Sequence, residues 1–336
     1  MVWINNSRIL SIFAVILIHV SAVAIDENVA GSLYWWLANF FDSSVRWAVP
    51  VFFMLSGYLL LSKDYDSDFK FYKKRLTRVF YPLLFWSFFY LLFRFCNLRF
   101  IQGVAVIDYQ TLFSSVVFGI PYYHMWFLYA IFFMYFFAPH LARIFKYSSK
   151  QSVTSLVLGM FSISILYTLF IHVRGGDDLI PIFVKFLIYI PFFVLGGFLR
   201  LYNFDVNVRW WLLVYITSVF FTMLGAYFLN LSYFYNGLSL TVVPMSLAVF
   251  LLAKKYSLII FGGYNRVVSD ATFGIYLVHP IFLSFFVYLL KKYDILSRVF
   301  GEYGIVGIPV ITLLVFFTSF LFVLILKRFY FFNRIV

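Results

Sequence analysis

Long apolar runs follow one another along the chain, and short polar segments separate them. An apolar run of about twenty residues is long enough to cross the ~30 Å hydrocarbon core of a membrane. The pattern predicts an all-α integral membrane protein, a single transmembrane domain over residues 1–336 with no attached soluble domain. Ten helices are predicted in one bundle, at about residues 9–25, 45–62, 79–96, 122–140, 152–172, 180–199, 210–229, 238–253, 271–290 and 304–326.

The basic residues predict which side of the membrane each loop faces, because cytoplasmic loops carry an excess of Lys and Arg. With the N-terminus inside, eighteen of the 26 basic residues fall in inner loops and seven in outer loops, and Lys185 lies within a span. Both termini are therefore predicted to be cytoplasmic. Ala22-Val23-Ala24 imitates a signal-peptide cleavage site, but the later spans need an inner N-terminus, so we interpret this segment as a retained helix.

Composition agrees with a membrane protein and limits the chemistry. Hydrophobic residues make up 64% of the chain and the mean hydropathy is +0.95, whereas soluble domains are roughly 45–50% apolar. The net charge of +13 could suggest a nucleic-acid partner, but the basic residues form short clusters between apolar runs, so none is predicted. The single cysteine, Cys96, excludes an intramolecular disulfide and a CxxC metal or redox site, and no metal is predicted.

The thirteen carboxylates are all expected in loops or at the ends of spans. Proton-coupled transporters usually carry an Asp or Glu inside the membrane as the coupling group. This pattern disfavours such a transporter. Imidazole, which titrates near neutral pH, is the group that remains for proton transfer.

Arg8 and His19 are two ionisable residues in the otherwise apolar first span. Eleven residues are close to three helical turns, so the two side chains project from nearly the same face, about 16 Å apart along the axis. Ionisable groups inside a membrane are functional candidates. The alternative is an arginine that snorkels to the surface and a buried histidine bonded to a carbonyl group.

A second basic cluster, KKRLTRVFYP, lies at the inner end of the third predicted span, from Lys73 to Pro82. Arg75 and Arg78 stand at i and i+3 and therefore share a helix face. Their guanidinium groups could make bidentate contacts with phosphate, although the positive-inside rule alone would also explain them. A long polyanion with phosphates at the surface and a reactive end deep inside would join this cluster to Arg8 and His19.

Five motifs, in order, resemble those of membrane acyltransferase family 3, which includes O-acetyltransferases of bacterial surface polysaccharides. Arg8 and His19 match the family's arginine and histidine separated by ten residues, and Arg75 and Arg78 match its R-x-x-R. Its FF-x-x-SG, H-x-W-F and Y-L-x-H motifs are similar to VPVFFMLSGYLL at 49–60, YYHMWFLYA at 122–130 and FGIYLVHP at 273–280. The likeness is greatest to the short stand-alone members that acetylate O-antigen or enterobacterial common antigen.

The resemblance implies acyl transfer from cytoplasmic acetyl-CoA to a sugar hydroxyl of a lipid-linked glycan that faces the periplasm. It also implies a multi-pass protein of the bacterial inner membrane, with acyl-CoA as a substrate and no permanently bound cofactor. Arg75 and Arg78, with Lys74 and Arg8, would hold the CoA phosphates. His19 would act as general base on the hydroxyl or, as an alternative, as an acyl-carrying nucleophile.

Four residues are candidates for the acceptor site or the tunnel that leads to it: Arg46, His124, Trp126 and His279. His124 and Trp126 belong to an aromatic group that could stack on a sugar ring or form an interfacial girdle. His279 could line the tunnel or serve a kink at Pro280. Arg46 could bind an acceptor phosphate or anchor a helix end.

Three further interpretations concern packing, a loop and an alternative function. Ser56 and Gly57 are interpreted as small residues that permit close helix packing. The segment at 104–120 is predicted to be an interfacial helix that shapes an acceptor site or caps the bundle.

The alternative function is a flippase or exporter of a lipid-linked glycan. In that case the basic cluster would bind the pyrophosphate of the glycan carrier. The pattern of carboxylates and the phase of Arg8 and His19 favour the enzyme.

Overall fold

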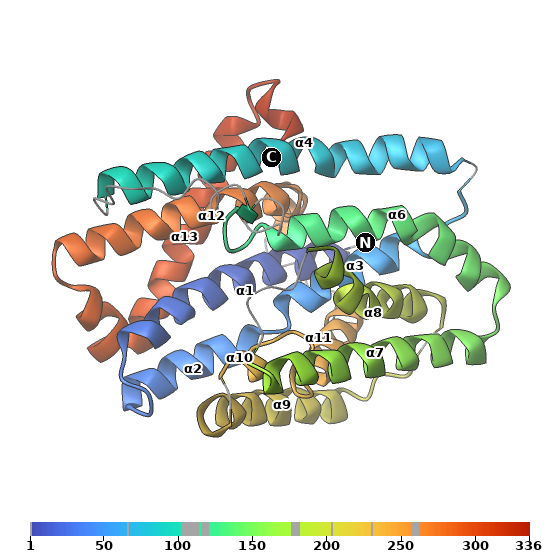
Figure 1. The fold of residues 1–336 in the computed structure, drawn as a ribbon, viewed down its shortest axis with the longest axis horizontal. Coiled ribbons are helices and arrows are strands. Elements are labelled where there is room, and N and C mark those ends of the chain that lie inside the picture. The colour runs from blue at the N-terminus through green and yellow to red at the C-terminus, as the bar shows by residue number, and fades with distance from the viewer. Residues whose placement is uncertain are drawn as a thin grey trace. The chain divides into compact units, whose positions relative to one another are not determined.

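The computed structural model describes residues 2–65, 67–101, 114–115, 121–175, 182–202, 204–229, 231–256 and 262–336. Within these ranges every regular element is a helix (Figure 1). Eight segments of the described chain are long and apolar enough to cross a membrane. The predicted all-helical membrane fold is confirmed, whereas the predicted interfacial helix at 104–120 lies outside the described residues except at 114–115.

Each predicted span coincides with a helix, and one further helix, α2, precedes the second span. The main helices are α1 (Val2–Glu27), α2 (Leu33–Val45), α3 (Ala48–Leu60), α4 (Asp68–Cys96), α6 (Trp126–Tyr147), α7 (Lys150–Val173), α8 (Ile182–Leu201), α9 (Val208–Phe228), α11 (Val242–Lys255), α12 (Asn265–Lys292) and α13 (Gly304–Leu326). The short ones are η1 (Asn97–Ile101), α10 (Leu231–Phe234), η3 (Gly262–Tyr264), η4 (Arg298–Glu302) and η5 (Phe332–Arg334).

Several helix ends differ from the predicted spans. For example, α1 begins at Val2 rather than at about residue 9, and α6 ends at Tyr147 rather than at about residue 140. Helix α4 begins at Asp68, well before residue 79, because Ser67 accepts a hydrogen bond from the backbone N–H of Lys70 and caps the helix. Asp68 adds a negative charge to the first turn, which the helix dipole favours. Helix α11 has only 14 residues, about 21 Å, and is therefore shorter than the hydrocarbon core.

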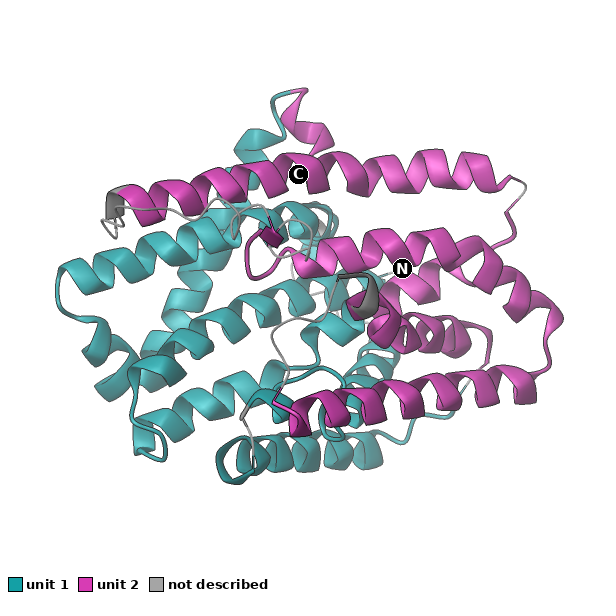
Figure 2. Cartoon of the chain, viewed as in Figure 1, with its two compact units in different colours: residues 1–52, 204–329, 336 teal, residues 53–203, 330–335 magenta. Residues whose placement is uncertain are grey.

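The chain divides into two compact units (Figure 2). Unit 1 contains residues 1–52, 204–329 and 336, and unit 2 contains residues 53–203 and 330–335. Helices α1, α2 and α9 to α13 belong to unit 1, whereas α4, α6, α7, α8 and most of α3 belong to unit 2. That the whole chain acts as one functional domain stays a prediction.

Helix α1 is the centre of unit 1. It packs against α2, α11, α12 and α13, and 15 of its 26 residues are buried, which explains why it is apolar on most of its circumference. Polar contacts near its start join it to α12. Asn6 accepts a hydrogen bond from the Asn265 amide at 2.7 Å, and Asn5 accepts one from the Ser269 hydroxyl at 3.2 Å.

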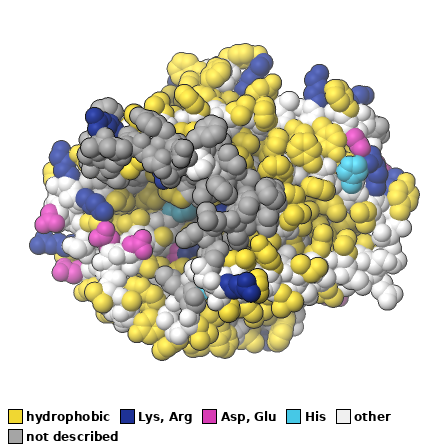
Figure 3. Space-filling model, in the orientation of Figure 1, with side chains coloured by type: hydrophobic (Ala, Val, Ile, Leu, Met, Phe, Trp, Pro, Cys, Tyr) yellow, Lys and Arg dark blue, Asp and Glu magenta, His cyan; other side chains and the backbone are white. Residues whose placement is uncertain are grey.

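Other helices expose apolar side chains in the way that lipid contact requires. On α7, Leu158, Ile163 and Leu166 are 62%, 71% and 64% exposed. Hydrophobic side chains also cover much of the face drawn in Figure 3. Soluble proteins rarely expose contiguous apolar surface on this scale, so the surface agrees with the membrane location of the fold.

Helices α3 and α8 of unit 2 approach each other at two glycines. A Cβ atom on Gly57 would lie 1.7 Å from the carbonyl oxygen of Phe193, and one on Gly196 would lie 1.9 Å from the carbonyl oxygen of Met54. The two backbones therefore touch where no side chain separates them, as small residues allow in membrane helices. The interpretation of Gly57 as a packing residue is confirmed.

Substituting Gly57 by alanine is expected to lower the stability of the protein by about 1–3 kcal/mol, the usual cost of overpacking. The added methyl group would meet backbone atoms, which cannot rotate away. Thermal unfolding of the detergent-solubilised protein measures the effect. Gly159→Ala in α7 is the matched control, because a Cβ at Gly159 has no neighbouring atom within 4 Å. Equal melting temperatures for the two variants would contradict the expectation.

Candidate functional site

Two histidines from α1 and α12 stack on each other inside unit 1. The ring centroids of His19 and His279 are 5.4 Å apart, and the ring planes differ by 21°. His19 keeps part of its surface exposed, whereas His279 is fully buried. The structure therefore brings together the predicted general base and one of the predicted tunnel residues.

The proline after His279 explains how that ring is held. Pro280 has no N–H, so the carbonyl group of Tyr276 loses its usual helical donor. His279 Nδ1 lies 2.7 Å from this carbonyl oxygen. Because a carbonyl only accepts, Nδ1 carries the hydrogen in the neutral ring and Nε2 carries the lone pair. The kink at Pro280 thus orients the imidazole that stacks on His19.

Helix α1 runs without a break from Val2 to Glu27 and contains both Arg8 and His19. The predicted phase of the two residues is therefore correct, with about 16 Å between them along the helix axis. Arg8 is half-buried. Helix α1 thus carries one cationic and one imidazole side chain on nearly the same face.

The predicted donor-binding residues Lys74, Arg75 and Arg78 lie on the first turns of α4, in unit 2. Lys74 and Arg78 are exposed and Arg75 is half-buried. Among the residues that the structure describes, no hydrogen bond or ion pair occupies these three side chains. Burial raises the pKa of the nearby Tyr65 to about 12, although Arg75 opposes the increase, so this hydroxyl stays protonated beside Arg75 at neutral pH.

A second basic pair at the same spacing behaves differently. Arg143 and Lys146, at the end of α6, form ion pairs with Asp68 and Asp64. Their charges are therefore neutralised within unit 2. Arg75 and Arg78 have no such ion pair within the described residues.

The two aromatic acceptor candidates lie in different surroundings. His124 is only 2% exposed and is enclosed by Tyr90, Tyr122 and Tyr123, with ring centroids 4.9–5.9 Å away. Trp126 packs on Tyr189 at 5.1 Å. The predicted aromatic group exists, but its tyrosines rather than His124 present the accessible surface.

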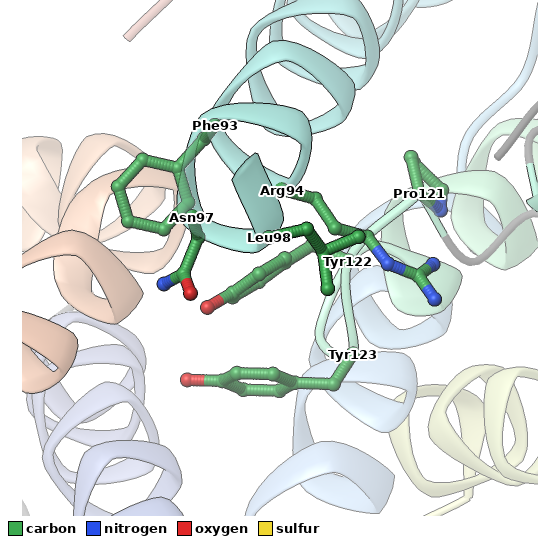
Figure 4. A pocket seen from close by; sticks show the side chains of 7 residues that line it. All are labelled: Phe93, Arg94, Asn97, Leu98, Pro121, Tyr122 and Tyr123. Carbon is green, nitrogen blue, oxygen red and sulfur yellow. The ribbon is translucent and has the colours of Figure 1, made fainter. Parts of the chain in front are cut away.

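A pocket of about 360 Å³ lies beside His124 and is bordered by Phe93, Arg94, Asn97, Leu98, Pro121, Tyr122 and Tyr123 (Figure 4). The hydroxyl groups of Tyr122 and Tyr123 and the amide of Asn97 point the same way in Figure 4, and the guanidinium of Arg94 points the other way. Aromatic faces with polar groups at their edges suit a ligand that is apolar on one face and polar at its rim. A sugar ring has this character.

Arg46 caps the C-terminus of α2, two residues before α3 begins. Helices α2 and α3 together form one apolar stretch of 28 residues, Leu33–Leu60, and Arg46 lies at the break between them. One backbone carbonyl at the break, that of Ser44, accepts hydrogen bonds from Trp47 Nε1 at 2.8 Å and from the Tyr215 hydroxyl at 2.9 Å. The break therefore carries a cation inside the stretch.

The prediction that every carboxylate lies in a loop or at the end of a span is wrong for Asp42. It is fully buried within α2. Four polar residues lower the hydropathy of this stretch: Asn39, Asp42, Ser43 and Arg46. For this reason α2 was not predicted as part of a span. Their spacing of i, i+3, i+4 and i+7 places them on one helix face, a signal that could have revealed α2.

Asp42 and Arg46 form a buried ion pair one turn apart. Asp42 Oδ2 accepts from Arg46 Nε at 2.6 Å and forms an ion pair with Nη2. Asp42 Oδ1 accepts from the Ser21 hydroxyl of α1 at 3.1 Å. Arg46 also interacts electrostatically with His19. The sequence did not indicate this ion pair, which contacts α1 at Ser21, two residues after His19.

Comparisons with known proteins agree with this arrangement. A family model described as an acyltransferase domain matches residues 1–328, which include all five motifs. Neither the curated proteins nor the solved structures gave a significant match. Since the family match spans nearly the whole of this helical, multi-pass chain, the protein belongs to acyltransferase family 3.

Proposed function

We propose that this membrane acyltransferase is an O-acetyltransferase of the bacterial inner membrane. It moves an acetyl group from cytoplasmic acetyl-CoA to a sugar hydroxyl of a lipid-linked or surface polysaccharide, and both of its termini are cytoplasmic. The stacked pair of His19 and His279 carries the proposal, because it places two imidazoles side by side on apolar helices, and His19 is not fully buried. Proton transfer by a positioned imidazole is the contribution that such a reaction needs.

In the proposed reaction His19 is the general base. It takes the proton of the sugar hydroxyl while the oxygen attacks the carbonyl carbon of the thioester. The bond between that carbon and sulfur then breaks, and the CoA sulfur receives the proton from the imidazolium. His279 supports this step as a neutral ring whose orientation is set by the carbonyl of Tyr276.

The remaining candidates take two roles in the proposal. Lys74, Arg75 and Arg78 hold the CoA phosphates, since their donors have no acceptor within the described residues, and Arg8 is a further donor-binding residue. The pocket bordered by Tyr122 and Tyr123 holds an acceptor sugar, and His124 packs behind these two rings. Trp126, which packs on Tyr189, is a further candidate for acceptor contact.

Incubating radiolabelled acetyl-CoA with membranes that contain the protein tests the proposal. We expect label to appear on glycan only when the protein is present, because the donor carries the transferred group. Membranes without the protein are the control, and labelled succinyl-CoA tests the choice of acyl group. Movement of glycan in proteoliposomes without acyl transfer from any donor would favour a flippase instead.

A further inference from the structure

We propose that Arg46, held in place by Asp42, stabilises the oxyanion that forms on the acyl carbonyl during transfer. The inference rests on the proposed function, with His19 as the base. All of the residues concerned belong to unit 1. Arg46 would be a catalytic residue because it touches the reacting oxygen, and Asp42 would be a positioning residue.

The hydrogen bonds of Arg46 leave two donors available. A guanidinium group has five N–H groups. Nε donates to Asp42, Nη2 forms an ion pair with the same carboxylate oxygen, and Nη1 donates to the carbonyl of Tyr235 at 3.1 Å. Within the described part of the chain, each terminal nitrogen therefore keeps one N–H without an acceptor. The side chain is 17% exposed, so a ligand atom can reach it.

The guanidinium is fixed before a substrate arrives. Asp42 is fully buried and also accepts from Ser21. The ring of Tyr235 lies 4.0 Å from the guanidinium carbon, and the Tyr235 hydroxyl donates to Asn39 at 2.6 Å. Burial raises the pKa of Tyr235, and Asp42 raises it further, so this hydroxyl keeps its hydrogen. Donors that need no reorganisation stabilise developing charge most effectively.

The charge balance favours a transient oxyanion over a permanent anion. Asp42 already neutralises Arg46, so the pair has no net charge for holding a phosphate. It can still donate two hydrogen bonds to an oxygen that gains charge in the transition state. Ser21, which donates to Asp42, lies two residues after His19 on α1, so the ion pair contacts the part of α1 that carries the proposed base.

Arg46 acts on the electron pair that moves onto the carbonyl oxygen during the attack. When the sugar oxygen bonds to the carbonyl carbon, the π electrons of the C=O bond move to the carbonyl oxygen, and the two N–H groups of Arg46 bind that oxygen. The electron pair then returns, the bond from carbon to sulfur breaks, and the sulfur takes the proton from His19. No other reactant is needed.

The double variant Asp42→Leu/Arg46→Met tests the inference, because replacing both partners of a buried ion pair by apolar residues often leaves stability unchanged. We expect kcat for acetyl transfer to fall by roughly 100- to 1,000-fold, the usual effect of losing one oxyanion donor. KM for acetyl-CoA should change much less than kcat, since the interaction is present in the bound donor but strengthens in the transition state. Arg46→Lys, which keeps the partner of Asp42 but loses the forked donors, should also lower kcat.

The matched control is Arg266→Gln/Asp270→Asn in α12, another Asp and Arg pair at i, i+4 that is 87% and 62% exposed. It should transfer acetyl at the wild-type rate. A spectroscopic measurement separates catalysis from folding: the carbonyl stretch of ¹³C-acetyl-CoA bound to His19→Ala should lie at a lower frequency than in water. The difference should disappear when Asp42→Leu/Arg46→Met is added to His19→Ala.

Two results would overturn the inference: a wild-type kcat in either Arg46 variant, or a carbonyl stretch that does not respond to Arg46. These results differ from a failure of the proposed function. If the wild-type protein transfers acyl groups from no donor, the proposed function fails. If the wild-type protein transfers acetyl, His19→Ala does not and the Arg46 variants do, only the oxyanion inference fails.

Discussion

Replacing His19 by alanine is expected to reduce acetyl transfer to background while CoA binding stays intact. The loss of a positioned general base costs roughly 100- to 10,000-fold in rate, and at the upper end of this range a membrane assay shows no turnover. The donor phosphates are proposed to bind elsewhere, so affinity for CoA should persist. Initial rates with labelled acetyl-CoA and calorimetric titration with CoA measure the two effects.

His140→Ala is the matched control for this substitution. His140 lies on α6, is exposed, and contacts the hydroxyl of Tyr72 at 3.4 Å. Its removal should leave transfer unchanged. Wild-type turnover in His19→Ala would refute the assignment of the base, and loss in His279→Ala alone would move the base to the other ring of the stack.

The double variant Arg75→Ala/Arg78→Ala is expected to bind acetyl-CoA at least 100-fold more weakly. Hydrogen bonds to charged groups each contribute about 1.5–3 kcal/mol, and about 1.4 kcal/mol corresponds to a tenfold change in affinity. At saturating donor, kcat should stay near the wild-type value, because neither guanidinium is proposed to touch the reacting carbonyl. Steady-state kinetics over a range of acetyl-CoA concentrations separates KM from kcat.

Arg143→Ala/Lys146→Ala controls for the general loss of positive charge. This pair has the same i, i+3 spacing, but Asp68 and Asp64 already neutralise it. We expect little change in donor affinity. An equal loss in both double variants would show that Arg75 and Arg78 act only through long-range charge, and the assigned phosphate contacts would be wrong.

The helical architecture could be predicted from the sequence because the hydrocarbon core requires apolar segments of a set length. The last predicted span, 304–326, coincides with α13 (Gly304–Leu326). Prediction failed where polarity interrupts a helix. The first turns of α4 were not predicted because they contain charged residues. Helix α2, which carries Asp42, was not predicted because one of its faces is polar.

The candidate site could be predicted only in its local parts. The phase of Arg8 and His19 follows from regular helix geometry, and the carbonyl freed by Pro280 follows from the missing proline N–H. The stacking of His19 on His279 could not be predicted, because it depends on how α1 and α12 pack. The ion pair of Asp42 and Arg46 required recognising α2 first, after which the i, i+4 spacing indicates it.

The short separation of Asp42 and Arg46 along the chain also affects how the protein reaches its membrane. A single charge at the centre of a span costs about 2.5–3.5 kcal/mol during insertion by the translocon. Because the two residues lie one turn apart at the end of α2, their ion pair can form while this segment is still the newest part of the chain. The segment can then enter the lipid as an electrically neutral hairpin partner of α1, before α9 and Tyr235 have been synthesised.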